Sequence, residues 1–326
     1  MISIVLLGVL ALLALVTQVG VIVIERRYPA QGRAIKIDAA TINLVDIGAT
    51  NSNGPPLLLL HGASSNLEAM RPLGDLLAAQ GHRVLLVDRP GHGWSRRAKL
   101  GDSTPAAQAR MLNQVLDEIG VKSVVLVAHS WSGALGTRMA LDFPERVAGL
   151  VMLAPVTHPW RGGVGRYNKA VTIPLLGPLL AHTITLPLGL ALLGPGARGV
   201  FLPQEMPEDF IDRSATPLLL RPREFLANAH DLVTLKPAVM EQMQRYGEIR
   251  CPVTVISGEA DTTVFTDIHS RAFARAVSQT RLIVLPGLGH MVQNAVPELV
   301  VAEIERMAGG RQDYCFCLPS LSKDET

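Results

Sequence analysis

Short, wholly apolar runs alternate along this chain with longer segments of helical periodicity, and this alternation restricts the fold more than any other feature. The run Leu57 to Leu60 precedes a helical pattern at 66–80, and the runs at 83–88 and 123–128 precede helical patterns at 105–119 and 131–142. Runs so short and so apolar are typical of strands that are buried on both faces. The β-α-β-α order predicts an α/β fold with a mostly parallel, doubly wound sheet.

The alternation is interrupted once, between a strand run at 147–153 and the next strand run at 252–258. A chain that leaves a sheet and later rejoins it is expected to carry an inserted unit between the two strands. We therefore divide the chain into a first core part at 33–155, a helical cap or lid insertion at 156–247, a second core part at 248–309 and a flexible tail at 310–326.

The first residues form a long apolar segment. Met1 to Ile24 contains no charged side chain, and as a helix it can cross a hydrocarbon core of about 30 Å. A cleavable signal peptide is the competing interpretation, but its basic start, shorter apolar core and small-residue exit are missing here. We predict a single-pass membrane anchor at 1–25. Because Arg26 and Arg27 follow it, the positive-inside rule predicts the remaining domain on the cytoplasmic side.

A second apolar segment, Ala170 to Ala197, also lacks charge, but Pro174, Pro178 and Pro187 interrupt it. Proline removes a helical hydrogen bond, so a single straight span is not expected. Two or three short helices that form a lid are predicted instead. Such a lid can line an apolar pocket or rest on the membrane surface.

Composition limits the possible partners. The net charge is +2, with no dense Lys/Arg cluster, which gives no indication of a nucleic-acid partner. Three cysteines, Cys251, Cys315 and Cys317, form no disulfide framework and no zinc-binding spacing. We predict no metal site and no cofactor, and we expect Cys251 to be a small core residue.

Polar residues follow the predicted strands, and the carboxyl ends of parallel strands form the binding edge of such a sheet. Ser130 lies at a sharp strand-to-helix turn in Val-Ala-His-Ser-Trp-Ser-Gly, and Asp261 and His290 follow the two late strands. A serine hydroxyl needs a base, an acid that orients the base, and N–H donors for the oxyanion. Ala63, after His61-Gly62, and Trp131, at a helix start, can offer those donors.

The turn after the third strand contains two serines. Its strand ends at Ala128, so Ser130 lies at the turn while Ser132 lies in the first helical turn. The turn requires small residues two positions before and after the nucleophile, and Ala128 and Ser132 satisfy this for Ser130. Ser130 is therefore preferred.

Other polar and aromatic residues have simpler interpretations. His61 and His129 are expected to be structural or to line the pocket, and Asp231, in the insertion, is expected at the surface. Trp94, Trp131 and Trp160 are equally consistent with pocket walls and with core packing.

The segments LLLLHGAS, VLLVDRPGHGWS, VLVAHSWSG, VISGEADTTV and LPGLGHM together resemble the α/β-hydrolase family, whose catalytic residues run Ser, acid, His in chain order. The insertion lies where that family carries its cap. The resemblance implies that Ser130 is the nucleophile, Asp261 the acid and His290 the base. It also implies that the N–H groups of Ala63 and Trp131 form the oxyanion hole.

A serine at the elbow points to acyl transfer to water, because epoxide- and halide-processing members carry an aspartate there. We expect a membrane-anchored serine hydrolase that cleaves a carboxylic ester with an apolar or lipid-like acyl group through an acyl-enzyme. The alternatives are an amidase or aminopeptidase, a thioesterase, a carbon–carbon bond hydrolase or a cofactor-free haloperoxidase, and in a different class a non-catalytic binding protein. An aminopeptidase would need acids in the cap, which Glu205, Glu208 and Asp209 can supply.

Overall fold

The computed structural model describes residues 2–50 and 54–309. The expected flexible tail, with Cys315 and Cys317, lies outside the described residues. The fold is built on one sheet with the strand order β1-β2-β4-β3-β6-β7-β8-β9, and β5 pairs with β2 at one side. All neighbours from β4 to β9 along this order are parallel, whereas β1 and β5 each pair antiparallel with β2, and β2 pairs antiparallel with β4. The predicted mostly parallel sheet is confirmed.

The strands match the apolar runs of the sequence. They are β1 (Arg33–Ile37), β2 (Ala40–Gly48), β3 (Leu57–Leu60), β4 (Arg83–Val87), β5 (Arg96–Arg97), β6 (Val124–His129), β7 (Val147–Leu153), β8 (Val253–Gly258) and β9 (Thr280–Leu285). Every residue of β3 and β6 is buried, which is why these runs lack the apolar–polar alternation of a half-exposed strand.

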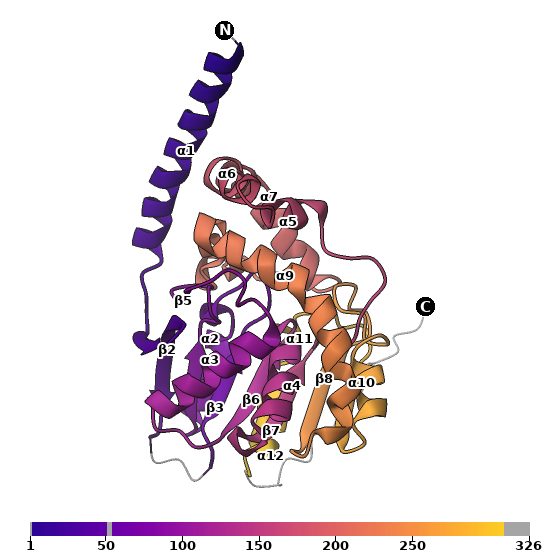
Figure 1. Cartoon of the computed structure of the whole chain (residues 1–326). Coiled ribbons are helices and arrows are strands. Elements are labelled where there is room, and N and C mark those ends of the chain that lie inside the picture. The colour runs from indigo at the N-terminus through magenta and orange to yellow at the C-terminus, as the bar shows by residue number, and fades with distance from the viewer. Residues whose placement is uncertain (1, 51–53, 310–326) are drawn as a thin grey trace.

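Helices cover both faces of the sheet (Figure 1). On one face pack α3 (Pro105–Glu118), α4 (Ser132–Asp142) and α10 (Ser270–Ala276), which bury Leu112, Leu135 and Phe273 among others. On the other face pack α2 (Arg71–Ala79), after the short 3-10 turn η1 (Leu67–Ala69), and α12 (Pro297–Met307), after the short α11 (Val292–Ala295). Each helix buries one apolar stripe, which produces a three-layer core.

A set of helices between β7 and β8 lies over the carboxyl edge of the sheet (Figure 1). It comprises α5 (Arg166–Val171), α6 (Leu176–Thr183), α7 (Thr185–Phe201), α8 (Phe210–Arg213), η3 (Thr216–Leu220), α9 (Pro222–Gln242) and η4 (Met243–Glu248). The apolar segment that the sequence breaks with prolines becomes α6 and α7, which meet at a bend of 67°. We call this set the helical insertion.

The first helix, α1 (Ile2–Arg27), stands along the side of the molecule and projects beyond the helical insertion (Figure 1). Among the described residues, Ile4–Arg27 is the one unbroken helix long and apolar enough to cross a membrane, with 11% of its most apolar window buried. Its second half is nevertheless docked, because Ile24 packs with Leu186 of α7 and with Ala215 and Leu218.

Candidate active site

The predicted nucleophile, Ser130, occupies a strained turn between β6 and α4. Its φ angle is +55°, in the left-handed region that side chains other than glycine rarely adopt. The turn is fixed by its own backbone, because the Ser130 N–H donates to the carbonyl of Leu153 and the Ser130 carbonyl accepts from Gly133 and Val156. These hydrogen bonds therefore hold the strained turn in place, and with it the hydroxyl at the end of the strand.

The crowding at this turn is relieved by two glycines of α4. A Cβ at Gly133 would lie 2.4 Å from the Cβ of Pro155, and one at Gly136 would lie 3.2 Å from the Cβ of Ala128 and 2.9 Å from Leu150 Cδ1. Ala128 can therefore occupy the position two before Ser130 because Gly136 carries no side chain. Sequence analysis recognised the small size of Ala128 but missed these two glycines.

Ser130, His290 and Asp261 form a continuous hydrogen-bonded chain at the strand ends. His290 Nε2 lies 3.0 Å from Ser130 Oγ, and His290 Nδ1 lies 2.7 Å from Asp261 Oδ2. The other carboxylate oxygen, Asp261 Oδ1, accepts the backbone N–H groups of Thr263 and Val264, both at 2.8 Å. All three residues are nearly buried, so the geometry suits transfer of the serine proton to the imidazole.

The alternative serine is directed elsewhere. Ser132 is fully buried, and its Oγ donates to the carbonyl of His61 at 2.5 Å. A hydroxyl whose proton is used in this way is not aligned with His290. The structure thus brings only Ser130, of these two serines, to the imidazole.

The two predicted oxyanion donors flank Ser130. Gly62 lies against the serine, since a Cβ there would be 3.0 Å from Ser130 Cβ and 3.5 Å from its Oγ. Ala63 lines the same cavity as Ser130, and Trp131 follows Ser130 directly at the start of α4. A helix start presents free N–H groups and the positive end of the helix dipole.

A second imidazole packs on the candidate base. The ring of His129 lies 4.9 Å from the ring of His290, and both rings border the cavity. Burial, together with the nearby His290, lowers the pKa of His129 to about 3. His129 is therefore neutral at physiological pH and adds no charge to the site, as expected for a pocket-lining residue.

The site opens into a large apolar cavity of about 590 Å³ beneath the helical insertion. Helix α7 supplies most of one wall, with Leu188, Leu192, Gly196 and Val200. None of the described residues that line it is Lys, Arg, Asp or Glu. The cavity therefore suits an uncharged, apolar ligand group.

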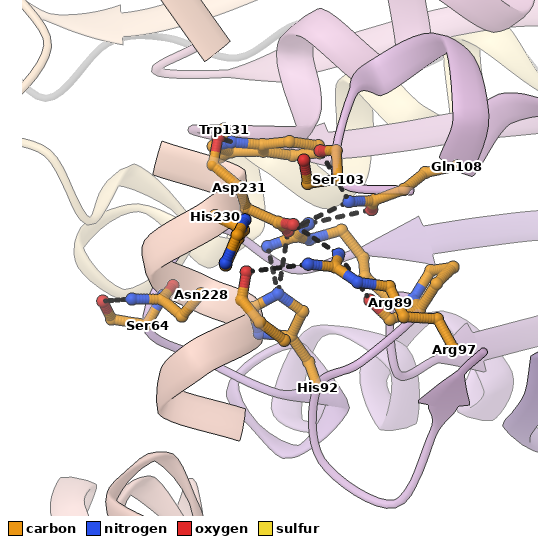
Figure 2. Close-up of polar contacts among 12 residues, drawn as sticks. Ser64, Arg89, His92, Arg97, Ser103, Gln108, Trp131, Asn228, His230 and Asp231 are labelled. Carbon is orange, nitrogen blue, oxygen red and sulfur yellow. Dashed lines mark hydrogen bonds and ion pairs between the residues drawn. The ribbon is translucent and has the colours of Figure 1, made fainter. Parts of the chain in front are cut away.

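The interpretation of Asp231 as a surface residue is wrong. Asp231, on α9, is fully buried and pairs with Arg89 at 2.7 Å, Arg97 at 2.5 Å and His92 at 2.9 Å. Gln108 donates to the same carboxylate (Figure 2). Burial by itself would raise the pKa of Asp231, but Arg97, the hydrogen bond from His92 and Arg89 lower it, so the carboxylate stays charged. A buried carboxylate needs such charged partners. The sequence pattern around Asp231 does not show them, because they come from distant parts of the chain.

The tryptophans pack outside the cavity. Trp131 is buried beside the ion cluster, with the Arg89 guanidinium 4.0 Å from its ring, and Trp94 lies near Arg221. Neither these two nor Trp160 lines the cavity in the described part of the chain. The acids weighed for an aminopeptidase, Glu205, Glu208 and Asp209, are exposed and absent from the lining as well.

Comparison with known proteins identifies the family of this fold. Residues 55–171 match the model of the alpha/beta hydrolase fold. A 2-hydroxy-6-oxononadienedioate/2-hydroxy-6-oxononatrienedioate hydrolase of Paraburkholderia phymatum is 30% identical over 243 residues, which are 72% of this chain and 81% of that protein. The chain belongs to the α/β-hydrolase family. The sequence-based prediction of fold and family is thereby confirmed.

Two further proteins resemble this α/β-hydrolase. A 2-hydroxy-6-oxo-6-phenylhexa-2,4-dienoate hydrolase of Burkholderia cepacia is 26% identical over 259 residues, 77% of this chain and 85% of that protein. A hydrolase structure from Pseudomonas aeruginosa superposes with a TM-score of 0.70 at 20% identity, covering 86% of this chain and all of that one. The named relatives favour the carbon–carbon alternative over the ester hydrolase that the sequence analysis put first.

Within this α/β-hydrolase, the described residues contain no group of three or more His, Cys, Asp or Glu side chains that could hold a metal ion. The chemistry available at the cavity is that of a serine, an imidazole, a carboxylate and backbone N–H groups. Cys251 is partly buried against the core, and burial raises the pKa of its thiol to about 11, so it stays protonated.

Proposed function

We propose that this protein is a serine hydrolase that attacks the carbonyl carbon of a largely apolar substrate, with a carbon–carbon bond next to a ketone as the bond it cleaves. The observation that carries the proposal is the Ser130–His290–Asp261 chain of hydrogen bonds, which opens into an uncharged cavity. The helical insertion acts as the cap that covers the substrate.

Each residue has a defined role in this proposal. Ser130 Oγ attacks the carbonyl carbon while His290 Nε2 accepts the hydroxyl proton, and Asp261 stabilises the imidazolium that forms. The N–H groups of Ala63 and Trp131 donate to the oxyanion. When the carbonyl re-forms, the bond to the leaving group breaks and His290 protonates that group. Water then hydrolyses the acyl-enzyme by the same route in reverse.

The named relatives support the choice of bond. The 2-hydroxy-6-oxo-dienoic acids in their names contain a ketone but no ester or amide, so hydrolysis must break a carbon–carbon bond. The electron pair of that bond moves onto carbon, which requires a substrate whose leaving carbon is stabilised by conjugation to a second carbonyl. A β-diketone or a vinylogous diketone satisfies this requirement.

Ester hydrolysis is the second candidate, and the cavity lining favours it. The substrates named for the relatives are carboxylates, whereas no described Lys or Arg lines this cavity. A buried carboxylate without a cation is unfavourable. An uncharged ester of a medium or long fatty acid fits the lining without this cost.

A substrate panel separates these candidates. We expect turnover of an uncharged aryl alkyl β-diketone, measured by loss of its enol absorbance, to exceed turnover of 2-hydroxy-6-oxo-6-phenylhexa-2,4-dienoate by at least tenfold, because the cavity offers the carboxylate no cation. Hydrolysis of p-nitrophenyl esters of rising chain length, with no diketone turnover, would establish the ester candidate. Inactivity on the whole panel would exclude both candidates.

A pair of variants on α7, one in the cavity wall and one outside it, tests whether the cavity binds the acyl group. Gly196 lines the cavity and has open space around the position of a Cβ. Gly196→Leu is therefore expected to raise KM several-fold for long acyl groups and to leave short ones unchanged. Gly199→Leu is the matched control, because it lies on the same helix with equally open space but outside the cavity lining. It should leave KM unchanged for long and for short acyl groups.

We further propose that α1 is a retained membrane anchor with the hydrolase domain on the cytoplasmic side. The second half of this helix is packed against the domain: Gly20 lets Leu186 approach within 2.8 Å of its Cβ position, and Glu25 pairs with the buried Arg221 at 3.0 Å. A signal peptide is removed from the mature protein and has no need of such contacts.

A further contact of α1 supports immersion of the helical insertion in the membrane leaflet next to the hydrolase domain. Thr17 contacts Thr183 at the α6–α7 bend, and Thr17 precedes the end of α1 at Arg27 by about 15 Å of helix. If α1 spans a bilayer of about 30 Å, the bend lies at mid-membrane depth. The surface there is apolar, with Ile173, Leu175, Leu176, Leu179 and Leu190 exposed. An apolar patch of this kind marks a contact surface.

Quenching by lipid nitroxides tests this arrangement. In a variant with the three native cysteines changed to serine, a fluorophore on Leu179→Cys is expected to be quenched by acyl-chain nitroxides in vesicles, as is one on Leu7→Cys. Glu118→Cys, an exposed position on α3, should not be quenched. Quenching at position 7 alone would contradict the immersion of the insertion, and no quenching at either position would contradict the anchor.

A further inference from the structure

The peptide unit that carries the Ala63 N–H is oriented by a buried arginine. Arg89 Nη2 donates to the carbonyl of Gly62 at 3.1 Å, and Arg89 Nε donates to the carbonyl of His61 at the same distance. The Gly62 carbonyl and the Ala63 N–H belong to one planar trans peptide, in which they point in opposite directions. The Ala63 N–H is therefore directed away from Arg89.

His61 supports the same carbonyl. Its Nε2 accepts the backbone N–H of Arg89 at 3.0 Å, so its Nδ1 carries the proton and donates to the Gly62 carbonyl at 2.9 Å. Burial and the adjacent Arg89 hold the pKa of His61 well below its usual value, which keeps this tautomer neutral. Two donors thus fix the peptide plane between Gly62 and Ala63.

Helix α9 of the insertion holds this arrangement in place. Asp231 anchors Arg89, and the Asp231 carbonyl accepts the indole N–H of Trp131 at 3.2 Å (Figure 2). One turn earlier, Asn228 Oδ1 accepts the N–H of Ser64 at 2.7 Å and its Nδ2 donates to Ser64 Oγ. Ser64 follows Ala63 and has a strained φ of +53°, which needs such support.

We propose that Arg89, Asp231 and Asn228 are positioning residues that aim the Ala63 N–H at the substrate oxyanion and fix Trp131 beside it. This inference rests on the proposed function, because it assigns a task to groups around the Ser130 site. It makes the helical insertion part of the catalytic apparatus as well as a cover, since two of the three residues lie on α9.

The charges around position 231 favour a carboxylate there. Arg89 and Arg97 both face Asp231, whereas the adjacent His92 is neutral because burial and Arg89 lower its pKa to about 4. Gln108 completes the shell around the carboxylate. Without the Asp231 charge, two buried guanidinium groups would repel one another, and Arg89 would no longer be held against the Gly62 carbonyl.

The test uses an inhibitor that needs the oxyanion hole. An aryl trifluoromethyl ketone adds to a serine as a charged hemiketal, whereas the corresponding alcohol binds without forming an oxyanion. In Arg89→Lys we expect ketone affinity and kcat/KM to fall together by ~10²–10³, the value of one oxyanion donor, while alcohol affinity stays within about threefold. Asn228→Ala, which removes no charge, should show the same selective loss at about tenfold.

Arg97→Lys is the matched control. Arg97 pairs with the same carboxylate but contacts neither the Gly62 nor the His61 carbonyl. It should lower the melting temperature without a selective loss of ketone affinity. Equal losses of ketone and alcohol affinity in Arg89→Lys and Asn228→Ala would overturn the inference. Failure of the wild-type protein to bind the ketone covalently at Ser130 would instead refute the proposed function.

Discussion

Replacing Ser130 with alanine is expected to lower kcat by about 10⁴–10⁶, to the level that remains when a nucleophile is removed from a serine hydrolase. The hydroxyl lies 3.0 Å from His290 Nε2, and alanine leaves the imidazole without a partner to activate. The strained backbone at position 130 tolerates the change, because alanine adds no atom. Turnover of the best substrate and labelling by a fluorophosphonate probe measure the effect.

Ser132→Ala is the control for this variant. It removes the hydrogen bond to the His61 carbonyl, which costs about 1 kcal/mol of folding stability, and it should retain labelling. Labelling that survives in Ser130→Ala and disappears in Ser132→Ala would show that Ser132, and not Ser130, is the nucleophile.

Asp261→Asn is expected to reduce kcat by ~10⁴ without loss of the fold, by the change of tautomer that such a substitution causes in other serine hydrolases. The backbone N–H groups of Thr263 and Val264 both donate to Asp261 Oδ1. In asparagine the amide oxygen must take that position, so the NH₂ group faces His290 Nδ1. The imidazole proton then moves to Nε2, and this nitrogen can no longer accept the proton of Ser130.

Thermal unfolding of this variant distinguishes a change of tautomer from a loss of folding. The melting temperature should change by only a few degrees, because the shape and the two backbone hydrogen bonds are kept. Asp267→Asn, an exposed acid a few residues later that pairs with Arg271, should leave kcat unchanged. Full activity in Asp261→Asn would remove Asp261 from the proposed mechanism.

The sheet could be predicted from the sequence because each strand is a run of consecutive apolar residues. Leu57–Leu60 and Val124–His129 are buried throughout, and uninterrupted apolar runs of this length have few other structural solutions. The proximity of Ser130, Asp261 and His290 follows from the same logic, since parallel strands deliver their carboxyl ends to one edge. Only the order of elements and the strand ends were needed.

The buried ion cluster could not be predicted in this way. Asp231 occupies a helical position that a polar residue usually takes at the surface, and its partners Arg89 and Arg97 are more than 130 positions away in the chain. The Asp-Arg-Pro-Gly-His-Gly stretch, which carries Arg89 and His92, follows β4 directly. What it contacts depends on where α9 lies over the sheet, which no local pattern determines.

The crowding at the nucleophile turn has an evolutionary consequence. Because a Cβ at Gly136 would lie 3.2 Å from the Cβ of Ala128 and 2.9 Å from Leu150 Cδ1, we expect positions 128 and 136 to be coupled: a larger residue at 136 is accommodated more easily when 128 is glycine. A larger residue at 136 is therefore expected to be tolerated better after 128 has become glycine than before. A search for glycine two residues before the serine overlooks such chains, since part of the required space is provided eight positions later.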